Sequence, residues 1–356
     1  MAKSNKVKSA ALAGLFAMVL FVHAPTSAAS TAIVAPSSAL GGIDAVHYVA
    51  DSGETNDVAI TVSGFDFTIV DPGATISVGP GCASVSASEV TCSLDFEVHV
   101  EVRLGDGNDA LSLAGDIEEG SGAYFGAGGN DTILGFGGPF SFEHLRGGPG
   151  NDVLRGRGGG DTLDGGSGAD LMSGGTSTSC EFLGCFPPDD TVTYANRSDP
   201  VFADADGVAD DGEVSEGDLI KRDVEVIRGG SGDDVLGGET INVRTFTGGG
   251  KFRYGMELWG NRGDDVLRGW RSSDYLLGGK GNDVLRGDGS NDGLAGGRGN
   301  DQLVGGHGRD HLSGGWGRDR LFARDGKPDR VGGGRGRDEA SIDRGLDRLR
   351  RVEELF

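Results

Sequence analysis

Residues 260–322 read GNRGDDVLR-GWRSSDYLL-GGKGNDVLR-GDGSNDGLA-GGRGNDQLV-GGHGRDHLS-GGWGRDRLF, seven consecutive units of nine residues. Every unit has Asp at its sixth place and Leu at its eighth. A short, fixed period is typical of a solenoid, in which each unit buries its apolar side only against its neighbours. The repeat therefore predicts a stack of short coils.

Looser copies of the unit occur upstream of this block. Residues 147–173 read GGPGNDVLR-GRGGGDTLD-GGSGADLMS, and single units stand at 105–111, 126–134 and 229–237. Taken over all copies, the sixth-place residues are Asp109, Asp131, Asp152, Asp161, Asp170, Asp234, Asp265, Asp274, Asp283, Asp292, Asp301, Asp310 and Asp319. These aspartates are the candidate metal ligands.

The spacing of these aspartates favours calcium. Two units make one coil, and coils stack about 4.8 Å apart, so the carboxylates fall in rows along the stack. Two charges ~4 Å apart repel by ~1 kcal/mol in water and by more at lower dielectric constant. Calcium relieves this repulsion with about six to eight oxygen ligands, and glycine-rich turns expose backbone carbonyls that complete the set. Magnesium demands octahedral geometry, and zinc or copper would prefer nitrogen or sulfur ligands.

The unit closely resembles the RTX (repeats-in-toxin, haemolysin-type) calcium-binding nonapeptide repeat. The resemblance covers residues 260–322 and 147–173, with single units elsewhere. It implies an all-β fold, a right-handed parallel β-roll, in which each calcium ion sits between turns one coil apart. On this basis we expect up to six sites, formed by the pairs Asp152–Asp170, Asp265–Asp283, Asp274–Asp292, Asp283–Asp301, Asp292–Asp310 and Asp301–Asp319. The turn glycines assigned to the sites are Gly147, Gly148, Gly150, Gly278, Gly279, Gly281, Gly296, Gly297 and Gly299.

Two departures from the pattern lead to further expectations. Arg309 and Arg318 occupy the fifth place of their units, and our hypothesis is that sites involving them are weaker, with Arg partly replacing calcium as the neutralising charge. The acidic run at residues 204–213 resembles an EF-hand loop in composition, but its ligand spacing fails at the fifth place. We expect a solvated acidic loop there, with weak calcium binding as the alternative.

The N-terminus is typical of a secretory signal. Residues 1–29 carry Lys3, Lys6 and Lys8, then an apolar stretch at 10–22, and then small residues that allow cleavage after Ala28 or Ala29. The apolar stretch is too short to span a bilayer, which makes an uncleaved anchor the weaker alternative. No other stretch is apolar enough to cross a membrane. The sequence therefore predicts a secreted, extracellular protein exported by a Sec-like signal peptide.

The four cysteines agree with export. They occur as two local pairs, Cys82 with Cys92 and Cys180 with Cys185, and an even count in a secreted chain favours two short-loop disulfides. A cysteine metal site is the weaker alternative, because no Cys-x-x-Cys or neighbouring His accompanies them.

The formal charge of the chain is −23, and it is unevenly distributed. Residues 1–260 contain 38 acidic and 14 basic side chains, whereas residues 261–356 contain 17 and 18. The acidity argues against nucleic acid as a partner and for cations. Because the Arg-rich end is balanced, the sequence predicts a poor phosphate-binding surface there.

The expected organisation is a signal peptide at 1–29, a β-rich N-terminal cap at 30–104, a first calcium-binding repeat region at 105–175, an irregular insertion with an acidic loop at 176–227, a second repeat region at 228–340 and a C-terminal cap at 341–356. Period-two patterning predicts the strands of the N-terminal cap. The last segment fits either a short amphipathic helix or a final strand.

Motifs that carry catalysis are absent from the sequence. It contains no H-E-x-x-H and no G-x-S-x-G, and His307 and His311 stand at variable places of one unit, where exposed side chains are expected. The sequence thus predicts a non-catalytic structural or binding module whose folding is coupled to calcium. A surface adhesin or matrix protein and a polysaccharide-active β-helix enzyme are the alternatives. A cell-surface or glycan partner is left open.

Overall fold

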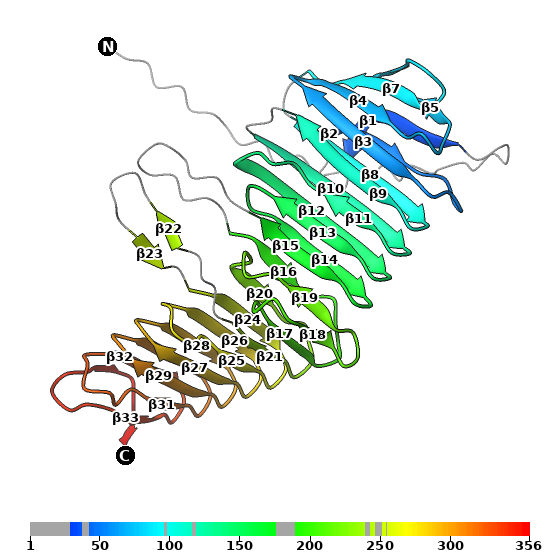
Figure 1. Cartoon of the computed structure of the whole chain (residues 1–356). Helices are drawn as coiled ribbons and strands as arrows, with labels where there is room; N and C mark the ends of the chain where they lie inside the picture. The colour runs from blue at the N-terminus through cyan, green and yellow to red at the C-terminus, as the bar shows by residue number, and fades with distance from the viewer. Residues whose placement is uncertain are drawn as a thin grey trace, which may run out of the picture.

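The computed structural model shows a long stack of parallel β-strands with a cap at its N-terminal end (Figure 1). The structure describes residues 29–37, 43–95, 98–115, 119–175, 189–238, 243–245, 251–253 and 255–356. No helix occurs in this part of the chain, and hence none that could span a membrane. The predicted all-β solenoid is confirmed, while the signal segment up to residue 28 lies outside the described residues.

The strands form two rows on opposite sides of the stack. The first row, sheet 1, is hydrogen-bonded in the order β5 (Ile76–Val78), β1 (Ser30–Ser37), β2 (Ile43–Val49), β8 (Val98–Asp106), β10 (Glu119–Gly128), β12 (Phe140–Pro149), β14 (Thr162–Ser167), β16 (Thr191–Thr193), β20 (Val226–Arg228), β24 (Glu257–Arg262), β26 (Tyr275–Lys280), β28 (Gly293–Arg298), β30 (His311–Trp316), β32 (Arg330–Arg335) and β34 (Arg348–Arg350).

The second row, sheet 2, runs through β6 (Cys82–Ser84), β7 (Glu89–Ser93), β4 (Asp66–Val70), β3 (Asp57–Ser63), β9 (Ala110–Gly115), β11 (Thr132–Leu134), β13 (Val153–Arg157), β15 (Leu171–Gly175), β19 (Asp218–Ile220), β18 (Ala209–Glu213), β17 (Val201–Asp204), β21 (Val235–Gly237), β25 (Val266–Arg268), β27 (Val284–Gly289), β29 (Gln302–His307), β31 (Arg320–Phe322), β33 (Glu339–Ser341) and β35 (Glu354–Leu355). A separate hairpin joins β22 (Val243–Thr245) to β23 (Lys251–Arg253).

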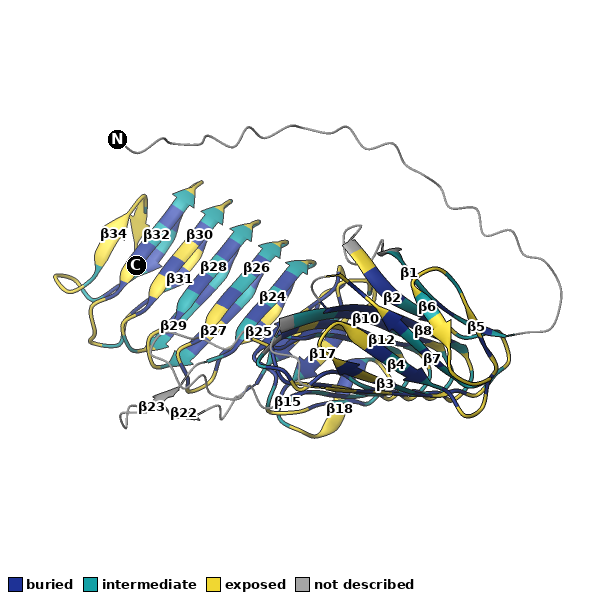
Figure 2. Ribbon diagram, turned by 90° about the horizontal axis from the view of Figure 1, so that it is seen from above, coloured by how far each residue is buried: buried dark blue, intermediate teal, exposed yellow. Residues whose placement is uncertain are grey.

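Consecutive units alternate between the two sheets, and their eighth-place leucines all face the core. Leu276, Leu294 and Leu312 are in register on neighbouring strands of sheet 1, and Leu285 and Leu303 are paired on sheet 2. All five are buried, and Figure 2 shows buried residues alternating with intermediate or exposed ones along the strands. Burying one such side chain contributes about 1.5–3 kcal/mol, so each coil is stabilised mainly by contact with its neighbours.

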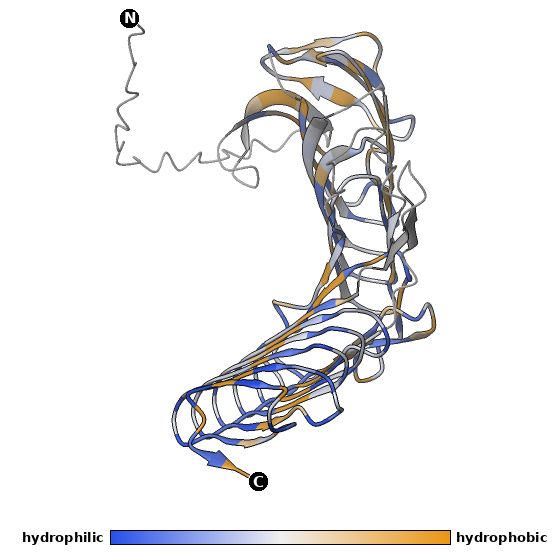
Figure 3. Cartoon of the chain, turned by 90° about the vertical axis from the view of Figure 1, so that its left-hand side faces the viewer, coloured by the Kyte–Doolittle hydropathy of each residue, from blue (hydrophilic) through white to orange (hydrophobic). Residues whose placement is uncertain are grey.

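Glycine at the fourth place allows the turns to stack. Gly299 has φ 137°, and a Cβ on this residue would lie 1.6 Å from the carbonyl oxygen of Gly281 in the preceding coil. No side chain fits at that distance, so the turns of successive coils approach through bare backbone. The stack curves between its two ends, as Figure 3 shows.

The N-terminal cap closes one end of the solenoid. β1 pairs antiparallel with β2, and β3, β4, β7 and β6 pair antiparallel in succession. Tyr48 and Phe67 lie fully buried in its core. The predicted disulfide Cys82–Cys92 is present and joins β6 to β7, whereas Cys180 and Cys185 lie outside the described residues.

Residues 189–227 differ from the expected irregular insertion. β16 and β20 continue sheet 1 and β17 to β19 continue sheet 2. Val192, Ile220 and Ile227 are buried in the core, although the Gly-Gly-x-Gly turn of the repeat does not precede them. The prediction of a solvated acidic loop is wrong for Asp211, which is buried and accepts hydrogen bonds from the N–H groups of Asp204 and Ile220.

The C-terminal segment 341–356 forms strands rather than a helix. β34 pairs with β32, and β35 pairs with β33, so this segment adds a final short coil to both sheets. Of the two conformations that the sequence allowed, the structure shows the strand.

Candidate metal centre

Two rows of carboxylates run along the stack, one before the strands of each sheet. Row 1, before sheet 1, consists of Glu143, Asp161, Asp190, Glu225, Asp274, Asp292, Asp310, Asp329 and Asp347. Row 2, before sheet 2, consists of Asp109, Asp131, Asp152, Asp170, Asp218, Asp234, Asp265, Asp283, Asp301, Asp319, Asp338 and Glu353.

Within a row, each carboxylate is tied to the coil before it. The backbone N–H of Asp265 donates to Oδ1 of Asp283 at 2.9 Å, and the N–H of Asp283 donates to Oδ1 of Asp301 at 2.9 Å. The same contact, at 2.8–3.0 Å, joins all six of the pairs expected from the sequence. The structure therefore brings these aspartates together in single file.

The second carboxylate oxygen is where a cation fits. Oδ2 is buried and has no hydrogen-bond partner within the described chain in Asp109, Asp131, Asp152, Asp161, Asp170, Asp265, Asp283, Asp292, Asp301, Asp310, Asp319, Asp329 and Asp338. Leaving a buried acceptor unsatisfied costs about 1–3 kcal/mol, and more for a charged group. Asp234 differs from the others, because its Oδ2 accepts the N–H of Gly230 at 2.7 Å.

First-place glycines let two kinds of oxygen approach one point. A Cβ on Gly260 would lie 2.2 Å from Oδ2 of Asp265 and 2.7 Å from the carbonyl oxygen of Gly278 in the next coil. No three His, Cys, Asp or Glu side chains of the described residues converge on a point. The donor set is thus carboxylate plus backbone carbonyl, which suits calcium and lacks the nitrogen or sulfur that zinc prefers.

The predicted turn glycines divide into two groups. Gly147, Gly278 and Gly296 stand at the first place, against Oδ2 of the aspartate in their own unit. The remaining six have positive φ and face carbonyl oxygens of the preceding coil instead: Gly148, Gly150, Gly279, Gly281, Gly297 and Gly299. The first group borders the unpartnered carboxylate oxygens and the second lets the coils stack closely; the assignment of all nine as site glycines stays a prediction.

Burial dominates the electrostatics of the rows. Desolvation, followed by repulsion from neighbouring carboxylates, raises the pKa of Asp265 and Asp301 to about 7, although a backbone N–H lowers it in part. Desolvation likewise raises the pKa of Asp283 and Asp319 to about 6 and that of Asp190 to about 9. Ionising a whole row at neutral pH is therefore unfavourable without a counter-charge.

Sequence periodicity missed several members of the rows. Glu143, Asp190 and Asp218 take the sixth-place position without the full Gly-Gly-x-Gly turn before them, and Asp329 and Asp338 follow residue 322, after which the spacing of nine is interrupted by one extra residue. Each is followed two residues later by a buried aliphatic residue: Leu145, Val192, Ile220, Val331 and Ala340. That shorter signal, an acidic residue two places before an inward-facing one, could have identified them.

The fifth place carries a second ladder. The N–H of Asn300 donates to Oδ1 of Asn282, and the N–H of Arg318 donates to Oδ1 of Asn300, both at 2.8 Å. In the neighbouring ladder the N–H of Arg309 donates to Oδ1 of Asn291. This ladder ends at Arg309, and the residue opposite in the next coil, Pro328, has no backbone N–H to donate. In the described chain neither Arg309 nor Arg318 forms an ion pair with a row aspartate, and weaker calcium sites beside them stay a prediction. His307 and His311 are exposed.

Comparison with known proteins agrees with this geometry. A family model described as the RTX calcium-binding nonapeptide repeat (4 copies) matches residues 143–176, 223–240, 257–285, 271–303 and 286–321. A search of curated proteins found no match. The first two matches begin at or just before Glu143 and Glu225, two of the row members that lack glycine turns.

We predict that Asp283→Asn removes two calcium ions from the folded protein. The amide keeps an oxygen for the N–H of Asp265 but lacks the second carboxylate oxygen, and Asp283 belongs to two pairs. In chelator the same change stabilises the chain by on the order of 1 kcal/mol, because it removes a buried carboxylate without a partner. Isothermal titration calorimetry and urea unfolding measure the two effects.

The matched control for this experiment is Asp264→Asn. Asp264 lies in the same turn as Asp265 but is exposed, and its Oδ1 accepts the N–H of Asn282. This change removes the same charge and leaves the calcium count unaltered. Equal counts for the wild type and Asp283→Asn would contradict the site.

The metal-free and calcium-bound proteins should respond to pH in opposite directions. The folded-state pKa values of about 6 to 7 lie above that of an unfolded Asp, about 3.9, so the folded state binds more protons in between. The stability of the metal-free chain is therefore retained below about pH 4 and lost as pH rises through about 6 to 7. With calcium it increases over the same range, because protons compete with the metal.

Urea unfolding at about pH 5 and about pH 7.5, in chelator and in calcium, measures this dependence. In chelator we expect an unfolding transition at the acid pH and little or none at the neutral pH, and in calcium we expect the midpoint to be higher at the neutral pH. A metal-free chain that becomes more stable towards neutral pH would show that the rows do not carry buried, unneutralised carboxylates.

Proposed function

Because the chain carries RTX calcium-binding nonapeptide repeats within residues 143–321, we propose that it is a secreted β-roll whose folding is coupled to calcium. Outside the cell it acts as a non-catalytic structural or binding module. The observation that carries this proposal is the long file of buried carboxylates, among which the 13 aspartates named above have an Oδ2 without a hydrogen-bond partner in the described chain.

Calcium supplies the free energy that the thin core lacks. Each coil places one leucine or similar residue per sheet in the interior, and the turns are mostly glycine, which loses the most conformational freedom on folding. A ligand that binds only the folded chain stabilises it in proportion to the logarithm of its concentration over Kd. Extracellular calcium modules have Kd values of about 10⁻⁴–10⁻³ M, so the chain folds where calcium is plentiful.

Two features support a location outside the cell. The N-terminal sequence is typical of a Sec signal, with an apolar stretch at residues 10–22. The Cys82–Cys92 disulfide suits an oxidising compartment. Before export, where calcium is low, the carboxylates within each row repel one another and keep the chain unfolded.

A non-catalytic role is supported by the surface of the described residues. The two hollows considered below, on the C-terminal part of sheet 1, are lined largely by arginine, and the acidic residues that line them are Asp310 and Asp329 of the rows. The carboxylate pairs are buried and hydrogen-bonded in the rows, where they hold the coils together.

Far-UV circular dichroism of the chain without residues 1–29 tests the coupling. We expect a cooperative gain of β-signal on titration with calcium, reversal by chelator, and no comparable gain with magnesium. A complete β-spectrum in chelator at neutral pH would overturn the coupling, and equal responses to both metals would overturn the assignment of calcium.

A further inference from the structure

The C-terminal part of the solenoid exposes far more positive than negative charge. Residues 261–356 contain 17 acidic and 18 basic side chains, which suggested a balanced surface. Nine of the acidic residues are buried in the two rows: Asp265, Asp274, Asp283, Asp292, Asp301, Asp310, Asp319, Asp329 and Asp338. Bound calcium would neutralise the same carboxylates, so basic side chains dominate the charge of the exposed surface.

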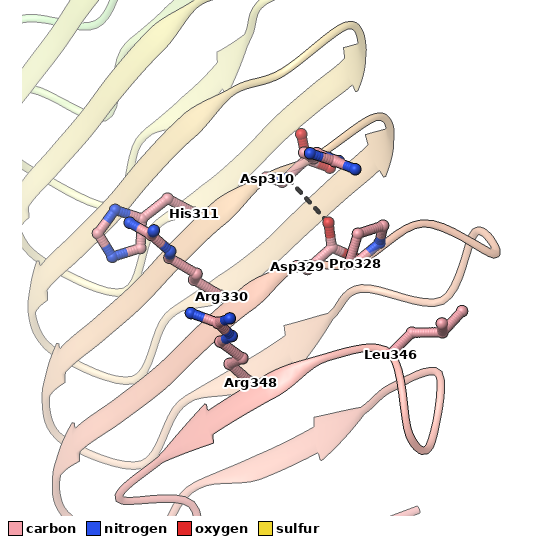
Figure 4. A pocket seen from close by; sticks show the side chains of 8 residues that line it. Asp310, His311, Pro328, Asp329, Arg330, Leu346 and Arg348 are labelled. Carbon is pink, nitrogen blue, oxygen red and sulfur yellow. Dashed lines mark hydrogen bonds between the residues drawn. The ribbon is translucent and has the colours of Figure 1, made fainter.

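One cluster of basic side chains lies on the outer face of sheet 1. There β30, β32 and β34 form a hollow of about 560 Å³, the basic groove, lined among others by His311, Ser313, Arg330, Gly332, Arg348 and Arg350. The parallel register aligns His311 with Arg330 and Arg348, and Ser313 with Gly332 and Arg350. Figure 4 shows His311, Arg330 and Arg348 side by side on adjacent strands.

The cations of the basic groove are not neutralised by the protein. No acidic residue lines the groove, and in the described chain no carboxylate lies within ion-pair distance of Arg330, Arg348 or Arg350. On the opposite sheet, by contrast, Arg320 pairs with Glu339 at 3.3 Å. An adjoining hollow of about 440 Å³ adds Arg309 and reaches the row residues Asp310 and Asp329.

We propose that the basic groove binds a chain of acidic polysaccharide lying across the strands, parallel to the long axis of the solenoid. Guanidinium groups bind carboxylate or sulfate through paired hydrogen bonds. Neighbouring strands place them about 4.8 Å apart, which suits a linear polymer with acidic groups on successive sugars. Ser313 and Gly332, which pair on neighbouring strands, are small and do not fill the groove between the arginines. This inference rests on the proposed function, because calcium-held coils keep the strands in register.

The shape and composition of the groove disfavour other polyanions. Single-stranded nucleic acid binds through aromatic side chains on which bases stack, and no Phe, Tyr or Trp lines the groove. The exposed Trp316, at the far end of β30, lies between the guanidiniums of Arg298 and Arg335, with 5.5 and 4.6 Å from each Cζ to the ring centroid. A lipid bilayer is flat, whereas this face is hollowed.

Calorimetric titration with a short heparin oligosaccharide, in calcium and in chelator, tests the proposal. The groove variant is Arg330→Gln with Arg348→Gln. The control is Arg286→Gln with Arg320→Gln, which removes the same charge from sheet 2. In calcium we expect the groove variant to bind about tenfold more weakly than the wild type, a loss of charge-assisted bonds, and the control to bind within about twofold. A neutral maltooligosaccharide should not bind.

Equal weakening of both double variants, or no binding by the calcium-folded wild type, would overturn the proposal. Tighter, groove-dependent binding of a single-stranded oligonucleotide or of anionic vesicles would reassign the groove. Circular dichroism establishes that each variant folds, and Arg350→Gln is a milder second variant should the double one not fold. If the chain also folds and binds heparin through the groove in chelator, the proposal of calcium-coupled folding is wrong, while the proposal that the groove binds acidic polysaccharide is supported.

Discussion

Hydrogen bonding between successive coils forces carboxylates of like charge into single file. Each N–H of a row aspartate needs an acceptor once it is buried, and Oδ1 of the aspartate one coil further on supplies it, as between Asp265 and Asp283. That contact fixes the stacking of the coils and leaves Oδ2 buried beside a first-place glycine. The same bond that builds the solenoid thus creates the repulsion that a cation relieves, and fold and metal site cannot be separated.

The regular part of this arrangement is visible in the sequence. Glycine at the first, second and fourth places, Asp at the sixth and Leu at the eighth together predict the turn, the ligand and the core residue, and the predicted aspartates from Asp265 to Asp319 all lie in the rows. Aspartates that contact each other in the structure are two units apart in the repeat. Periodicity therefore predicted which residues meet without any knowledge of long-range contacts.

The rest of the rows was hidden because tertiary packing replaces the turn glycines. At Asp190 only the acidic residue and the inward-facing aliphatic residue two places later remain of the repeat, and at Glu143 these two remain together with the first-place Gly138. Asp211 was predicted to be solvated because its neighbours are acidic, but it is held in a hairpin by two backbone N–H groups. The balanced charge count of residues 261–356 likewise failed to predict the charge of the surface. A count does not show that the row aspartates are buried and the arginines of β32 and β34 are exposed.

The charge pattern follows from the rows. In residues 261–356 nine row aspartates are buried while the arginines of β32 and β34 are exposed, so calcium would leave this end of a chain of formal charge −23 with a positive face. The central claim is that cations sit along the rows, and anomalous diffraction from crystals grown in calcium tests it most directly. We predict a file of anomalous peaks beside the unpartnered Oδ2 atoms of consecutive row aspartates. A folded solenoid without such peaks, or with peaks only away from the turns, would contradict it.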